Sequence, residues 1–183
     1  MVILLTTPQA SAQALTAAQL NRTACVSCHG DNGNSTVANI PSLAGQPRIF
    51  LENQLVMIRE GLREIPEMNG LLKQVSDQQI QELSTLLSSQ SLEPPPKANK
   101  ELIKFARGEE LSKKSLCGTC HMPQYQGQNQ VPRLAGQRED YLLKTMIAMR
   151  DGKAVGRDTM MSGVLAGFTD QQISAMAHFF SNR

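Results

Sequence analysis

Cys25-Val-Ser-Cys-His29 recurs 92 residues later as Cys117-Gly-Thr-Cys-His121, and these two pentads contain all four cysteines of the chain. C-x-x-C-H is the attachment motif of c-type haem. Two thiols on adjacent faces of one helical turn can form thioethers with the two vinyl groups of a porphyrin. The histidine that follows can then offer a ring nitrogen to the iron. The two pentads therefore predict two covalently bound haem c groups.

Two other roles of paired cysteines fit the sequence less well. A thioredoxin-like redox pair lies near a βαβ pattern, and no segment here alternates convincingly as a strand would. A Cys₄ zinc site usually separates its two pairs by about 15–20 residues. Here 88 residues, 29–116, lie between the pairs. We therefore expect each pentad to serve its own haem.

Two further segments repeat in the same order in the two halves of the chain. Pro41-Ser-Leu-Ala-Gly-Gln46 returns as Pro132-Arg-Leu-Ala-Gly-Gln137. Ser76-Asp-Gln-Gln-Ile80 returns as Thr169-Asp-Gln-Gln-Ile173. The offsets of these segments and of the pentads all lie between 91 and 93 residues. Matched blocks in one order indicate two copies of a single domain.

A proline-rich stretch marks the boundary between the copies. Residues 92–99 contain three successive prolines, which cannot continue a helix and favour a stiff extended spacer. We expect residues 15–91 to form an N-terminal domain and residues 100–183 a C-terminal domain. Residues 1–14 hold a short apolar run and Ala-x-Ala sequences, which we interpret as the remnant of an export signal or as a tail.

The sequence predicts an all-α fold with about three helices in each copy. Apolar residues such as Ile80 and Leu83 follow helical spacing. An S/T-x-x-Q capping box opens the third helix of each copy, at Ser76 and at Thr169. The expected helices span residues 16–27, 47–61 and 76–89 in the first copy and residues 100–116, 139–152 and 169–182 in the second.

The sixth iron ligand is predicted to be a methionine in both copies. Met68 lies between the second and third expected helices, eight residues before Ser76, and Met161 lies eight residues before Thr169. A methionine thioether favours ferrous iron and raises the reduction potential. The repeat therefore selects Met68 and Met161, and Met160 is the main rival of Met161.

Two prolines are candidates for supporting the proximal histidines. A histidine that binds a metal donates its other ring N–H to an acceptor that fixes the orientation of the ring. Pro41 and Pro132 follow the pentads closely, and a proline carbonyl on a rigid backbone can serve as that acceptor. Rigidity of the loop is a second reason for a proline, and the two roles are compatible. His178 has no C-x-x-C before it, and we interpret it as a packed or surface histidine.

The charge of the chain is small but unevenly distributed. The formal net charge is +2. Residues 1–91 hold five basic and seven acidic side chains, whereas residues 92–183 hold thirteen and nine. The basic half could steer an acidic partner, although interleaved glutamates also fit an ordinary solvated helix face. Nucleic-acid binding is not expected, because no basic stripe has interleaved aromatic residues. No segment approaches the length of a membrane span.

The two pentads, the twin Pro-x-Leu-Ala-Gly-Gln segments, Pro66-Glu-Met-Asn-Gly70 and Asp158-Thr-Met-Met161 together resemble the di-haem cytochrome c4 family. The resemblance extends over nearly the whole chain from about Thr16. It implies two tandem cytochrome c-like domains related by pseudo-two-fold symmetry. One departure concerns the second axial ligand, since the family commonly has Asp-Thr-Met-x-Met, which is one residue longer.

The resemblance also implies the chemical role of individual residues. The thioether cysteines are Cys25, Cys28, Cys117 and Cys120. The iron ligands are His29 with Met68 in the first domain and His121 with Met161 in the second. The carbonyl acceptors of the proximal histidines are Pro41 and Pro132.

The function implied by the resemblance is electron transfer without enzymatic activity. Members of the family work in the periplasm, in some cases loosely at the inner membrane, and pass electrons from haem or copper proteins toward terminal oxidases. We expect a monomer. The alternative is a cytochrome subunit held permanently in a dehydrogenase complex, such as a flavoprotein sulfide dehydrogenase. A di-haem peroxidase would need a vacant or labile iron site, and the paired methionines argue against that.

Overall fold

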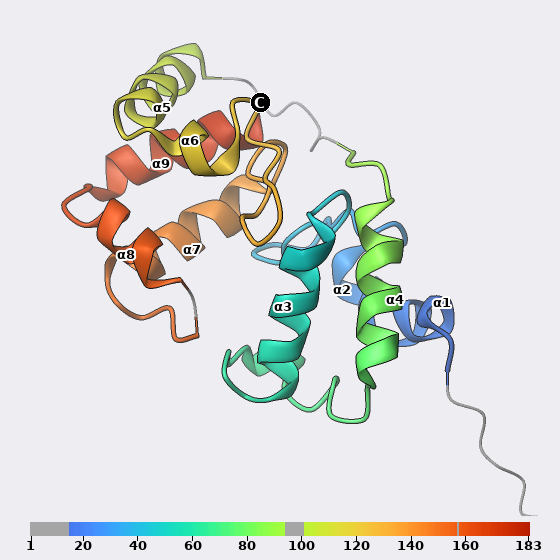
Figure 1. Ribbon diagram of the computed structural model, residues 1–183. Coiled ribbons are helices and arrows are strands. Elements are labelled where there is room, and N and C mark those ends of the chain that lie inside the picture. The colour runs from blue at the N-terminus through green and yellow to red at the C-terminus, as the bar shows by residue number, and fades with distance from the viewer. Residues whose placement is uncertain (1–14, 94–100, 157) are drawn as a thin grey trace, which may run out of the picture.

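The computed structural model describes residues 15–93, 101–156 and 158–183, which form two helical bodies (Figure 1). The described part of the chain contains helices and a single isolated β-bridge between Gln128 and Val131. The all-α fold class is therefore confirmed. The expected signal remnant at residues 1–14 and most of the expected linker at 92–99 lie outside the described residues.

The N-terminal body contains all three helical regions expected in the first copy. Its elements are α1 (Ala17–Leu20), the π-helical segment η1 (Asn21–Cys25), α2 (Val26–His29), α3 (Arg48–Arg59), the 3₁₀ turn η2 (Pro66–Met68) and α4 (Asp77–Ser88). Thr16 and Ser76 cap α1 and α4, each in a complete capping box. The first expected helix is therefore present, but a π-helical segment interrupts it.

The C-terminal body repeats this plan with a longer first helix and one extra helix. Its elements are α5 (Leu102–Lys114), α6 (Cys117–His121), α7 (Glu139–Arg150), α8 (Thr159–Leu165) and α9 (Asp170–Ser181). The ends of all six expected helices agree with the structure to within two residues, and Thr169 forms the predicted capping box. Helix α8 was not expected. It is short, and Asp158 caps it by accepting a hydrogen bond from the Met160 N–H at 2.8 Å.

Each body has its own hydrophobic core. The N-terminal core consists of aliphatic side chains, among them Ile80 and Leu83 on α4. The C-terminal core is centred on α9 and adds Tyr125, Phe179 and Phe180, whose rings pack at tilted or edge-on angles. Separate cores are consistent with two domains, because each body buries its own apolar faces.

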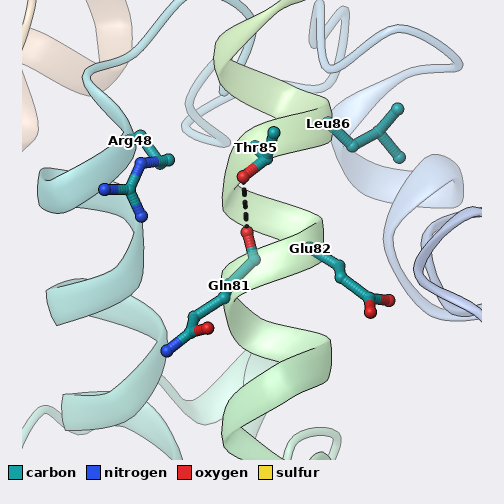
Figure 2. Close-up of a pocket in the computed structure, with 5 residues that line it drawn as sticks. All are labelled: Arg48, Gln81, Glu82, Thr85 and Leu86. Atoms are coloured by element: carbon teal, nitrogen blue, oxygen red, sulfur yellow. Dashed lines mark hydrogen bonds between the residues drawn. The ribbon is translucent and has the colours of Figure 1, made fainter.

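The first helix covers more of the last helix in the C-terminal body than in the N-terminal body, where α1 packs against only part of α4. A shallow groove beside α3 and α4 is lined by Arg48, Gln81, Glu82, Thr85 and Leu86 (Figure 2). The repeat offset places Ala175 and Phe179 of α9 at the positions of Glu82 and Leu86. There α5 packs closely, since a Cβ atom on Gly108 would lie 2.0 Å from the Ala175 carbonyl oxygen. Helix α5 has 13 residues whereas α1 has four, and none of the described helices fills the groove.

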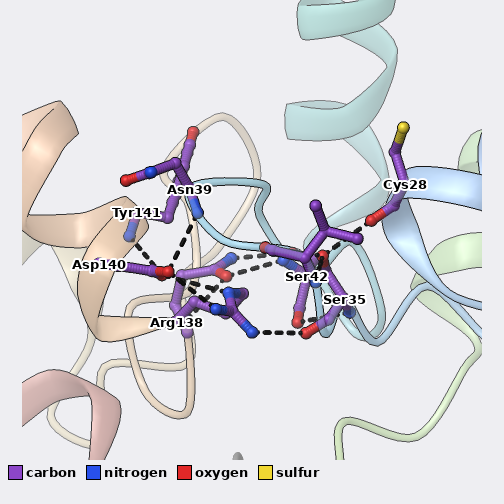
Figure 3. Close-up of polar contacts among 9 residues, drawn as sticks. Cys28, Ser35, Asn39, Ser42, Arg138, Asp140 and Tyr141 are labelled. Atoms are coloured by element: carbon purple, nitrogen blue, oxygen red, sulfur yellow. Dashed lines mark hydrogen bonds and ion pairs between the residues drawn. The ribbon is translucent and has the colours of Figure 1, made fainter.

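Polar contacts join the two bodies. The Arg138 guanidinium donates to the Ser35 carbonyl at 3.0 Å and pairs with Asp140, which itself accepts from the Asn39 N–H at 3.0 Å (Figure 3). The bodies also approach at Gly156, where an added Cβ atom would lie 2.0 Å from the Leu62 carbonyl oxygen. The loop after each pentad therefore faces the other body.

Candidate functional site

The N-terminal pentad lies at the junction of two helical segments. Cys25 ends η1, and Cys28 and His29 belong to α2. π-Helical segments are rare, and they occur frequently at functional sites. Cys25 is half-buried and Cys28 is exposed. The Cys28 carbonyl accepts a hydrogen bond from the Ser35 hydroxyl at 2.8 Å, which ties the pentad to the loop that follows it.

The C-terminal pentad forms a separate short helix. Leu116 adopts the left-handed conformation, with φ at 56°, and α6 then begins at Cys117 and ends at His121. Cys117 is half-buried and Cys120 is exposed, as in the first body. The chain therefore enters the pentad through a π-helical segment in the N-terminal body and through a left-handed residue in the C-terminal body. In both bodies the two thiols and the histidine lie on one helical turn.

The histidines of both pentads are buried and bonded to a proline. Nδ1 of His29 lies 2.9 Å from the Pro41 carbonyl oxygen, and Nδ1 of His121 lies 2.9 Å from that of Pro132. A carbonyl oxygen only accepts, so Nδ1 carries the proton in each ring. The lone pair is then on Nε2, which is the form of histidine that binds a metal.

The protonation state of the two histidines favours metal binding. Burial lowers the pKa of both His29 and His121 and outweighs the proline hydrogen bond, which raises it. The rings are therefore neutral at physiological pH. Burial also raises the pKa of the Cys25 and Cys117 thiols.

The candidate axial methionines differ in their exposure. Met68 ends η2 and packs against the N-terminal core. Met161 lies on α8 and packs against the C-terminal core, whereas the side chain of Met160 is 67% exposed. The packing favours Met161 over Met160, because a haem held inside the domain would be reached by a side chain that packs against the core.

Sequence reasoning did not assign a role to Tyr125. It is buried and hydrogen-bonded to the Ser112 hydroxyl at 2.8 Å, beside the C-terminal pentad. The Tyr125 carbonyl accepts from Leu134 and Ala135, just as the Gly33 carbonyl accepts from Leu43 and Ala44. The repeat offset of 92 residues relates Gly33 to Tyr125, so it could have identified the turns at these two residues as equivalent.

The residues present fit a covalently attached haem in each body. Each pentad supplies two thiols on one turn and a histidine whose Nδ1 is occupied, and a partly buried methionine follows in each body. In the described ranges no three side chains of His, Cys, Asp or Glu are grouped as a metal site. The chemistry of the donors therefore suits haem c.

Comparisons with known families support this assignment. The family model "Cytochrome c" matches residues 105–183. The model "Cytochrome C oxidase, cbb3-type, subunit III" matches residues 12–87. Each body therefore matches a cytochrome domain of its own. Among the helices of the described residues, none is long and apolar enough to cross a membrane.

The chain is also similar to whole proteins with two such domains. It is 31% identical over 172 residues to cytochrome c4 of Pseudomonas aeruginosa, covering 89% of this chain and 85% of that protein. It is 30% identical to a thiosulfate dehydrogenase electron acceptor of Thiomonas intermedia, covering 86% of this chain and 77% of that protein. The crystal structure of reduced recombinant cytochrome c4 from Pseudomonas stutzeri matches with a TM-score of 0.81 at 31% identity, covering 91% of this chain and 96% of that one.

Proposed function

The chain belongs to the cytochrome c4 family of di-haem electron carriers, and from this premise we propose that it shuttles electrons in the periplasm from a haem or copper protein toward a terminal oxidase. Its two covalently bound haem c groups follow from the family and from the two pentads. When bound, each haem supplies one-electron exchange between ferrous and ferric iron.

We assign the ligands by residue. Cys25 and Cys28 form the thioethers of the N-terminal domain, and His29 with Met68 completes the iron coordination. In the C-terminal domain the thioethers come from Cys117 and Cys120, and the iron ligands are His121 and Met161. Saturated coordination excludes substrates from the iron, so the protein carries electrons and does no bond-making chemistry.

The observation that best supports this proposal is the hydrogen bond from each pentad histidine to a proline carbonyl, which is the same in both domains. Two sites 92 residues apart hold a buried histidine by the same 2.9 Å bond to a proline carbonyl. Burial and a fixed ring keep the ligand geometry similar in both oxidation states, which favours electron transfer.

The domains proposed for the full chain are residues 15–91 and 100–183, with a linker at residues 92–99.

Visible spectroscopy of the oxidised protein tests the ligands. We expect two equivalents of the methionine-to-iron charge-transfer band. Met68→Ala and Met161→Ala should each remove one equivalent, and the control Met160→Ala should remove none. A protein whose band is lost with Met160→Ala and kept with Met161→Ala would contradict the second assignment.

A second candidate function is a subunit or dedicated acceptor of a dehydrogenase. The similarity to thiosulfate dehydrogenase electron acceptors supports it. Size-exclusion chromatography of the native protein distinguishes the two candidates. A free electron carrier elutes as a monomer of about the 20.0 kDa chain mass. Stable co-elution with a dehydrogenase would support the alternative.

A further inference from the structure

The glutamines that end the two Pro-x-Leu-Ala-Gly-Gln segments each bond to the opposite body. Oε1 of Gln137 accepts from the Ser42 N–H at 2.8 Å, and its Nε2 donates to the Ser42 carbonyl at 2.8 Å. Gln46 makes the same pair of bonds to Arg133, at 2.9 and 3.0 Å. Ser42 and Arg133 are equivalent positions of the repeat, so this contact has the two-fold symmetry of the fold.

Each glutamine bonds to the same peptide group that holds a proximal histidine. The Ser42 N–H belongs to the peptide whose carbonyl is that of Pro41, and this carbonyl accepts from His29 at 2.9 Å. The Arg133 N–H belongs to the peptide whose carbonyl is that of Pro132, and His121 donates to it at 2.9 Å. One peptide group therefore connects each histidine to a glutamine of the other domain.

The glutamines are held firmly in this orientation. The side chains of Gln46 and Gln137 are buried, with residue exposures of 5% and 4%. The two bonds of each amide fix it, because Nε2 must face the carbonyl and Oε1 must face the N–H. Oε1 of Gln137 also accepts from its neighbour, the Arg138 N–H, at 3.0 Å. A buried and fully bonded amide holds its partner peptide in one position.

Hydrogen bonds in such a chain polarise one another. Donation from the peptide N–H to the glutamine increases the negative charge on the carbonyl oxygen of the same peptide. That oxygen then attracts the Nδ1 proton of the histidine more strongly, which makes the ring a more basic ligand. A more basic ligand stabilises ferric iron and lowers the reduction potential, since hydrogen bonding around the ligands is one of the factors that set the potential.

We propose that Gln137 and Gln46 are positioning residues that tune the haem of the opposite domain, through the Pro41–Ser42 and Pro132–Arg133 peptides respectively. This proposal rests on the ligand assignment of the proposed function. The reduction potential of each haem then depends on a glutamine of the opposite domain as well as on its own domain. Separation of the domains then changes both haems through their proximal histidines.

The test is a crossed pair of variants in the haem-loaded full chain. The measurement is the reduction potential of each haem, followed by NMR of haem methyl signals assigned to their domains. Gln137→Leu should raise the potential of the N-terminal haem and leave the C-terminal haem unchanged, and Gln46→Leu should do the reverse. We expect the equilibrium constant for reduction to rise about 1.3- to 4.5-fold, from a 10–30% change in one hydrogen bond to a charged group. At 59 mV per tenfold this is about 7 to 39 mV.

Two controls separate this effect from a loosened interface. Leu92→Ala removes an apolar side chain that lies beside Gly136 in the same contact and has no polar atom to bond to either peptide. It should leave both potentials unchanged. Gln137→Asn keeps a polar amide but is one methylene too short to reach Ser42. It should shift the same haem as Gln137→Leu, and in the same direction, even if the leucine variant folds poorly.

The outcomes are distinct from those of the ligand test. Equal shifts of both haems in every variant, or a shift only in the domain that carries the substitution, would overturn the proposal. So would unchanged potentials in a protein that shows both methionine charge-transfer bands. In that last case the ligand assignment stands and only the tuning by glutamine fails. Absence of the bands in the unmodified protein would instead contradict the proposed function.

Discussion

At the scale of single residues, the residue that follows each pentad has an unusual backbone conformation. Gly30 has φ at 80° and ψ at 160°, and Met122 occupies the equivalent position with φ at 69° and ψ at 157°. This region of φ and ψ is adopted almost only by glycine. The fold therefore imposes the same turn on both domains, and the C-terminal domain accepts backbone strain at Met122 to make it.

The turn at Gly30 leads to a prediction about stability. A Cβ atom there would lie 2.2 Å from the Asn34 carbonyl oxygen, so backbone must move. Gly30→Ala should lower the free energy of unfolding by about 3 kcal/mol or more, measured by chemical denaturation. The control Gly61→Ala has φ at 71° but no atom within 4 Å of the new Cβ, and should cost only about 1 kcal/mol. Equal losses in the two variants would contradict the steric explanation.

At the scale of helices, the crossing of α5 and α9 depends on a glycine. Gly108 has no side chain, and a Cβ atom would lie 2.6 Å from Cβ of Phe179 as well as against the backbone of Ala175. Gly108→Ala should destabilise the protein by about 3 kcal/mol. Gly163→Ala is the matched control, since Gly163 lies on α8 with no atom within 4 Å. It should stabilise the protein by up to about 1 kcal/mol, because alanine is the better helix former. Calorimetry of both variants provides the comparison.

Glu139 joins three helices by its carboxylate. It lies 2.8 Å from Lys104 on α5 and 2.7 Å from His178 on α9. Burial acts to raise the pKa of Glu139, but the bonds to Lys104 and His178 outweigh it and lower the pKa below its usual value. A carboxyl group whose pKa is lower in the folded state stabilises the protein above its unfolded pKa, and this stabilisation is lost as the pH falls through the folded pKa.

Glu139→Gln should therefore show a pH-dependent loss of stability. We expect a loss of about 1 kcal/mol at neutral pH, which shrinks as the pH falls below the ordinary glutamate pKa of about 4.3. Urea unfolding at several pH values measures the difference. Glu110→Gln removes an exposed pair with Arg107 and should cost less than about 0.5 kcal/mol at any pH. A loss for Glu139→Gln that stays constant down to pH 3 would refute the linkage.

At the scale of the whole molecule, the docking of the two domains depends on close backbone contact at Gly156. Gly156→Ala would place a Cβ atom 2.0 Å from the Leu62 carbonyl oxygen, while each hydrophobic core stays unchanged. We expect the domains to separate and to unfold in two resolved calorimetric transitions, with a cost at the contact of about 2 kcal/mol. Gly152 lies in the same loop with φ at 67° and no atom within 4 Å of an added Cβ. Gly152→Ala should cost about 1 kcal/mol for the positive φ and should not separate the domains.

Sequence alone determined the features that depend on local spacing. The pentads, the capping boxes at Ser76 and Thr169 and the extents of the main helices all follow from patterns within a few residues, because a helix is stabilised by contacts three and four residues apart. The repeat offset extended these patterns to the second domain and selected Met68 and Met161. It also suggested Pro41 and Pro132 as the residues behind the histidines.

Only the tertiary structure decided which parts of the two copies differ and how they meet. Helix α5 covers α9, whereas in the described part of the chain the equivalent face of α4 lines an open groove. The twin glutamines were visible as a repeat, but their bonds to the opposite domain were not. Local periodicity reports which face of a helix is buried and not which distant segment buries it. Contacts between residues about 90 positions apart depend on how two complete domains pack, and this packing leaves no regular pattern in the sequence.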